Sequence, residues 1–146
     1  MKKTTLFIFV VALLFSSCSD TEKGYRFYCK IDGAPFDSDD IPEASVTTTT
    51  ITVIAYSESS RFQLTTPYSQ QDLYQTGDAG EGLVQYWPDG NNISEVYTSE
   101  GADTSGYIFI ERITGSGVTG SFKATLRKDG SPDIALEGGD FYARRP

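Results

Sequence analysis

The chain has 146 residues, with 12 Lys plus Arg, 20 Asp plus Glu, no His, two Cys and a formal charge of −8. This length is typical of one domain, which excludes two-domain enzymes. The lack of histidine excludes Ser-His-Asp catalysis, Cys-His catalysis and His-ligated zinc, because each needs an imidazole. The acidic balance, without any Lys/Arg cluster, argues against nucleic acid as a partner.

Residues 1–17 have the pattern of a secretory signal peptide. Lys2 and Lys3 precede an uninterrupted apolar run over residues 6–15. That run is shorter than the roughly 20 residues that a helix needs to span a membrane. We therefore expect residues 1–17 to be removed during export.

The residues that end this segment, Leu-Phe-Ser-Ser-Cys at 14–18, resemble a bacterial lipobox. The resemblance implies that Cys18 is acylated, begins the mature chain and anchors it in the membrane. Ordinary signal cleavage, with a plain thiol at Cys18, is the alternative. Residues 18–24 form a polar tether, whose acidic start is similar to the export signals of some Bacteroidota lipoproteins. We therefore expect an outer-membrane lipoprotein exposed at the cell surface.

From residue 25 to residue 146 the dominant period is two, which predicts a single all-β domain. The clearest alternation covers residues 118–127, where Val118, Phe122 and Leu126 alternate with polar side chains. No window has a convincing helical period. The other predicted strands are 25–31, 46–56, 61–66, 83–87, 93–98, 107–114, 134–136 and 141–144.

Turn residues separate these predicted strands. Asp-Gly pairs stand at 32–33, 89–90 and 129–130, and glycine-rich corners stand at 115–117 and 138–139. Such residues favour tight connections, because glycine adopts positive φ without strain. Short strands joined by such turns, with no helices between them, predict an antiparallel β-sandwich or a small open barrel of about 8–9 strands.

Several segments together resemble a family of short Bacteroidota lipoproteins of unknown function. They are the aromatic strand with its Ile-Asp-Gly turn at 27–36, the apolar strand at 107–113, the Gly-x-Phe segment at 118–122 and the final aromatic segment at 138–142. The resemblance implies an all-β envelope lipoprotein without an established activity. It carries over no catalytic residue, so function has to be argued from sites.

An acidic loop is a weak candidate for a metal site. Asp37, Asp39 and Asp40 place three carboxylates within four residues, and oxygen ligands at this density can hold Ca²⁺. The segment lacks the glycine and the final glutamate of a complete calcium-binding loop. A solvated loop is therefore the alternative, and no other cofactor is expected.

A weak candidate for a ligand site lies at the end of the strand predicted over 83–87. Tyr86 and Trp87 precede a loop that contains Asn91 and Asn92. Aromatic faces pack on the C–H surfaces of sugars and amides bond their hydroxyls, so these residues are candidates for binding a glycan. The alternative is that the two rings close one end of the core.

These observations predict a membrane-anchored binding or interaction module that is not an enzyme, with a glycan or an envelope protein as its partner. A structural or protein-interaction module without a small ligand is one alternative. A small hydrolase is another, and it would need two carboxylates converging on one bond. Cys29 stands on the apolar side of its strand, where we expect a buried and inert thiol.

Overall fold

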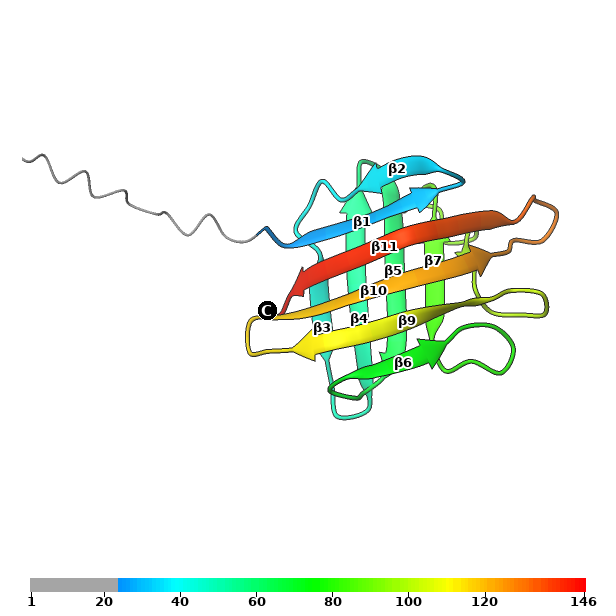
Figure 1. The fold of residues 1–146 in the computed structure, drawn as a ribbon. Coiled ribbons are helices and arrows are strands. Elements are labelled where there is room, and N and C mark those ends of the chain that lie inside the picture. Colours follow the sequence, from blue (N-terminus) through cyan, green and yellow to red (C-terminus); the bar gives the residue numbers. More distant parts are fainter. Residues whose placement is uncertain (1–23) are drawn as a thin grey trace, which may run out of the picture.

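The structure is a computed structural model that describes residues 24–146. The predicted signal peptide, Cys18 and most of the predicted tether lie outside the described residues. Within them the chain forms eleven strands and no helix (Figure 1). No helix of these residues could cross a membrane. The prediction of an all-β fold is confirmed.

The strands differ in length from two to eleven residues. In chain order they are β1 (Arg26–Ile31), β2 (Ala34–Asp37), β3 (Glu43–Val46), β4 (Thr50–Ser57), β5 (Ser60–Pro67), β6 (Asp72–Gln75), β7 (Leu83–Trp87), β8 (Tyr97–Thr98), β9 (Gly106–Ile113), β10 (Gly117–Leu126) and β11 (Ile134–Arg144).

The strands are arranged in two layers that cross (Figure 1). The front layer has the order β6-β9-β10-β11-β1-β2, and the back layer has the order β3-β4-β5-β7-β8. Strands within each layer pair antiparallel. One parallel contact, between Arg144 and Glu43, joins β11 to β3, and a bridge from Thr98 to Arg127 joins the layers elsewhere. The sheet therefore curls into a half-barrel, as expected for a sandwich or small open barrel.

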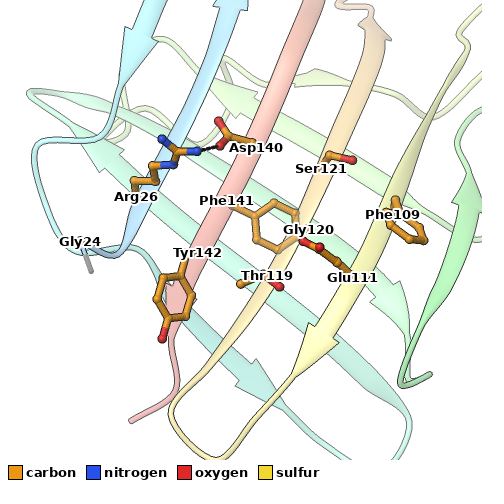
Figure 2. Close-up of a pocket in the computed structure, with 10 residues that line it drawn as sticks. All are labelled: Gly24, Arg26, Phe109, Glu111, Thr119, Gly120, Ser121, Asp140, Phe141 and Tyr142. Carbon is orange, nitrogen blue, oxygen red and sulfur yellow. Dashed lines mark hydrogen bonds and ion pairs between the residues drawn. The ribbon is translucent and has the colours of Figure 1, made fainter. Parts of the chain in front are cut away.

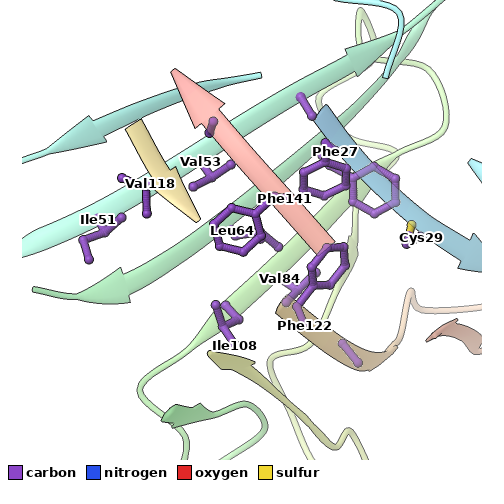
Figure 3. Packing of buried hydrophobic residues seen from close by; sticks show 14 of the residues in the cluster. Phe27, Cys29, Ile51, Val53, Leu64, Val84, Ile108, Val118, Phe122 and Phe141 are labelled. Carbon is purple, nitrogen blue, oxygen red and sulfur yellow. The ribbon is translucent and has the colours of Figure 1, made fainter. Parts of the chain in front are cut away.

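Aromatic side chains fill the space between the two layers. Phe27 from the front layer lies 5.2 Å, between ring centroids, from Phe62 of the back layer and 5.0 Å from Phe122 of β10. All three are buried in one cluster with aliphatic residues. Figure 3 shows Phe27 and Phe122 among those neighbours. Cys29 lies in the same cluster, where burial raises the pKa of its thiol to about 12. The thiol therefore stays protonated at neutral pH, and the prediction of a buried cysteine is confirmed.

Glycines let two phenylalanine rings pack directly on neighbouring strands. β10 and β11 each contain a Gly-x-Phe segment, and their register places Gly120 opposite Phe141 and Phe122 opposite Gly139. A Cβ at Gly139 would lie 2.6 Å from the Phe122 ring, and one at Gly120 would collide with the Phe141 ring. Each ring therefore covers the backbone of the opposite glycine, a way of stabilising glycine within a sheet.

The strand predicted over 46–56 is two strands instead of one. The four consecutive threonines form the turn between β3 and β4, where Thr47 Oγ1 accepts hydrogen bonds from the backbone N–H groups of Thr49 and Thr50, at 3.2 and 2.9 Å. Threonine favours strands through its branched side chain, but its hydroxyl also stabilises turns. Here the local hydrogen bonds of Thr47 favour a turn over a continuous strand.

Other strand boundaries also differ from the sequence prediction. Segments 134–136 and 141–144 are parts of the single strand β11, because Gly138, with φ of 58°, forms a bulge that lets the strand continue. Of the strand predicted over 93–98 only β8 forms, and Ile93 is 77% exposed. The short strands β2 and β6 were not predicted, since four residues give too little periodicity.

Adding a methyl group at Gly139 tests the packing between β10 and β11. We expect Gly139→Ala to lower the free energy of unfolding by about 1–3 kcal/mol, because the new Cβ would overlap the buried Phe122 ring. Gly115→Ala is the matched control, since its Cβ would meet no atom within 4 Å. Denaturant unfolding of both variants measures the difference, and equal stability would contradict the packing described here.

Candidate functional site

The structure does not present Trp87 as a platform for a sugar. Its side chain is 8% exposed, and the guanidinium carbon of Arg61 lies over the ring, 4.7 Å from its centroid. The turn at Gly90 packs against Ser59 and Arg61, with the Gly90 N–H donating to the Ser59 carbonyl oxygen. A stacking sugar needs an open ring face, so the exposure that the glycan prediction requires is not found at Trp87.

Tyr86 belongs to the packing of the core. Its ring stacks on Phe62 with 4.5 Å between centroids, and burial raises the pKa of its hydroxyl above the usual value. Asn91 and Asn92 are exposed in a turn, in which Asp89 Oδ1 accepts a hydrogen bond from the Asn91 N–H at 3.0 Å. The four residues therefore do not converge on one surface, and the alternative of core packing holds for Tyr86.

The acidic loop supports a hairpin turn. Asp39 Oδ2 accepts hydrogen bonds from the Ser57 hydroxyl at 2.7 Å and from the Glu58 N–H at 2.8 Å. Glu58 has a positive φ of 49°, and these contacts hold the two-residue connection between β4 and β5. Within residues 24–146 no three acidic or cysteine side chains form a group that could hold a metal ion. Asp37, Asp39 and Asp40 are therefore not brought together as a group of metal ligands in this part of the chain.

An open groove crosses the outer face of the front layer (Figure 2). We call it the outer groove, and its volume is about 620 Å³. Ser121 and Asp140, the central residues of the two Gly-x-Phe segments, lie opposite each other on its floor. The side chains that define it are Arg26, Phe109, Glu111, Ser121, Asp140 and Tyr142.

An ion pair borders the outer groove on the β1 side. Arg26 Nη2 donates to Asp140 Oδ2 across the pairing of β1 with β11. The Arg26 side chain is 65% exposed, so solvent screens the pair and its contribution to stability is small. Both partners keep further hydrogen-bonding capacity, because guanidinium has five donors and carboxylate has several acceptor sites.

Tyr142 is held in place at one side of the outer groove. Its ring packs on Tyr25 with 4.6 Å between centroids, and the Tyr25 hydroxyl donates to the Ser116 carbonyl oxygen at 3.3 Å. Gly117 lies against the Tyr142 ring, where a Cβ would collide with it. These contacts restrict the ring before any ligand arrives, which lowers the entropic cost of binding.

A β-bulge in β9 places Glu111 at the rim of the outer groove. Ile110 pairs with Gly120 and Arg112 pairs with Thr119, so Glu111 has no partner on β10. Both Glu111 and Arg112 are exposed as a result. Bulges redirect side chains and occur often beside functional sites. Alternation along the sequence cannot show this bulge, because it depends on the register between two strands.

The outer groove is not apparent from the alternation of residues along the sequence, although the sequence contains one signal of it. Residues 107–110 are apolar at every position, whereas the outer face of a sandwich strand is usually polar. Ile108 and Ile110 are buried in the core, and Phe109 faces the groove, half-buried. An aromatic residue on the solvent face therefore marked the site.

The single Trp of the chain reports on the burial of Trp87. We expect Arg61→Ala to increase acrylamide quenching of the fluorescence and to shift the emission to longer wavelength, because the guanidinium over the ring is lost. Arg112→Ala, an exposed arginine on the other layer, is the control and should leave the emission unchanged. An unaltered spectrum in Arg61→Ala would show that Arg61 does not cover the ring.

Comparison with known proteins identifies the family. No curated protein and no solved structure matches the chain. A family model described as a domain of unknown function, DUF6252, matches residues 26–143. The match includes all six side chains that define the outer groove, and it agrees with the expectation of an uncharacterised family. The chain belongs to the DUF6252 family.

Proposed function

We propose that this protein is an envelope lipoprotein that binds a glycan in the outer groove and catalyses no reaction. The observation that carries the proposal is the combination of two aromatic rings, Phe109 and Tyr142, with paired charges and hydroxyls on one face of a sheet. Ligand sites typically combine apolar walls with a few placed polar groups.

The chemistry of the outer groove matches that of a sugar. Sugar rings have C–H surfaces, which pack on aromatic rings, and hydroxyls, which both donate and accept hydrogen bonds. Arg26 supplies donors, Asp140 supplies acceptors, and the Ser121 hydroxyl supplies both. These groups stand on paired strands, so they are already positioned when a ligand arrives.

The proposal favours binding over hydrolysis, although Glu111 and Asp140 both line the outer groove. A glycosidase needs one carboxyl that burial keeps protonated as the general acid. Glu111 is exposed, and the Asp140 side chain is 36% exposed and forms an ion pair with Arg26. Neither carboxyl has the surroundings of a general acid.

The start of the described chain supports a role at the membrane. Gly24 lines the outer groove (Figure 2), and Cys18 stands six residues before it in the sequence. Six residues span at most roughly 20 Å. An acylated Cys18 would therefore hold the groove close to the membrane surface.

The lipid anchor is tested with the two cysteines of the chain. We expect Cys18→Ala to abolish incorporation of labelled palmitate and to release the protein from the membrane fraction, since acyl chains supply the membrane affinity. Cys29→Ala is the matched control and should retain the label, because Cys29 is buried in the core. Continued labelling of Cys18→Ala would overturn the proposed anchor.

Glycan binding is tested with the full-length protein in detergent. A glycan array identifies the best ligand, and titration calorimetry measures its affinity. We expect Tyr142→Ala and Phe109→Ala each to weaken binding by roughly tenfold, because each removes an aromatic contact. Tyr56→Ala is the control, since Tyr56 is 44% exposed and does not line the outer groove.

Two outcomes of these measurements would overturn the proposal. The absence of binding to any glycan on the array would favour an envelope protein as the partner, which crosslinking on intact cells would then identify. Release of reducing sugar from a bound oligosaccharide would instead show a hydrolase, with Glu111 and Asp140 as the carboxylates to replace.

A further inference from the structure

A second depression adjoins the outer groove at Glu111. This middle depression has a volume of about 360 Å³ and is lined by Gln70, Gln71, Glu111, Arg112 and Ile113. Glu111 lines both hollows, so they are neighbours on the surface. The bulge that exposes Glu111 beside Arg112 therefore creates the border between them.

A third depression adjoins the middle one. This end depression has a volume of about 600 Å³, and it shares Gln70 and Ile113 with the middle depression. Tyr68 and Arg145 also line it, together with the threonine turn that joins β3 to β4. The Tyr68 N–H donates to the Thr49 carbonyl oxygen at 2.9 Å, which fixes this segment against the turn.

The three hollows together exceed the needs of one small ligand. Pockets that hold a small molecule have volumes of about 300–1,000 Å³, and each of the three lies within that range by itself. Because each shares lining residues with the next, a single ligand that fills them has to be elongated. An extended polymer chain meets this requirement, and an isolated monosaccharide does not.

The chemistry of the outer groove is repeated along this path. Tyr68, 39% exposed, supplies an aromatic ring in the end depression. Gln70 and Gln71 supply amides that both donate and accept. No hydrogen bond or ion pair joins the Arg112 side chain to another of residues 24–146, so its five donors are free for a ligand.

The charges along the path favour a ligand without net charge. Three arginines line the hollows, Arg26, Arg112 and Arg145, and two carboxylates accompany them, Glu111 and Asp140. These charges nearly cancel, so the path does not have the large excess of cations that would hold a polyanion, and the whole chain has a formal charge of −8. A neutral hydroxyl-rich chain can accept from the guanidinium groups and donate to the carboxylates.

We propose that the three depressions form one extended groove for a linear neutral glycan, with the outer groove at one end and Tyr68 at the other. This inference rests on the proposed function, because it assigns the class of glycan to the same site. It predicts separate contributions from the two ends, since each end contacts a different unit of the same chain.

The experiment measures the affinity of the full-length protein in detergent for cello-, xylo-, manno- and laminari-oligosaccharides of increasing length. We expect affinity for the recognised series to rise from the disaccharide to the hexasaccharide. Tyr68→Ala should remove that increase, a loss of roughly tenfold for the hexasaccharide, and should weaken disaccharide binding much less than hexasaccharide binding. Tyr142→Ala should weaken binding at every length.

Matched variants separate this inference from the proposed function. Tyr56→Ala replaces a tyrosine of similar exposure outside the three depressions, and it should bind all lengths normally. Affinity that depends on Tyr142 but not on chain length would overturn the extended groove and leave the outer groove intact. The absence of binding to any oligosaccharide would overturn both. Oligogalacturonates, measured beside the neutral series, are the acidic probes, and tighter binding to them would overturn the assignment of a neutral ligand.

Discussion

The pairing of Gly120 with Phe141 and of Phe122 with Gly139 determines both faces of the front layer. On the inner face, each ring covers the backbone of a glycine on the opposite strand. A Cβ at either glycine would overlap the ring, so only glycine lets both aromatic rings pack there. On the outer face, the same alternation leaves the central residues of both segments exposed to the groove. A change that disturbs this register would therefore alter the core and the proposed site together.

The two layers are held together by a chain of aromatic contacts. Phe141 lies next to Phe122, which packs on Phe27, and Phe27 meets Phe62 of the back layer, which stacks on Tyr86; the centroid separations are between 4.5 and 6.5 Å. Aromatic pairs at such distances contribute beyond their buried area. Residues 24–146 contain one cysteine, Cys29, which is buried and free. No disulfide therefore links these residues to one another, and this part of the protein depends on packing for its stability.

The proposed binding surface uses side chains that the core does not need. Phe109 and Tyr142 point away from the buried cluster, on strands whose alternate residues fill it. A rigid two-layered core thus supports a row of outward groups whose spacing is set by the strands. The bulge at Glu111 extends this row towards Tyr68 and so links the outer groove to the neighbouring depressions. An open surface of this kind suits an elongated ligand better than a compact ligand, which would be held in a closed pocket.

The sequence alone was sufficient to predict the all-β class, the apolar side of β10 and the burial of Cys29. Each of these depends on alternation, which is a local property of the chain. It was not sufficient for the threonine turn, where side-chain hydrogen bonds compete with strand propensity. Trp87 shows the same limit, since its burial depends on Arg61 from a neighbouring strand. The outer groove depends on register between β9, β10 and β11 and on one bulge, and pairing between distant segments is fixed only when the two layers pack.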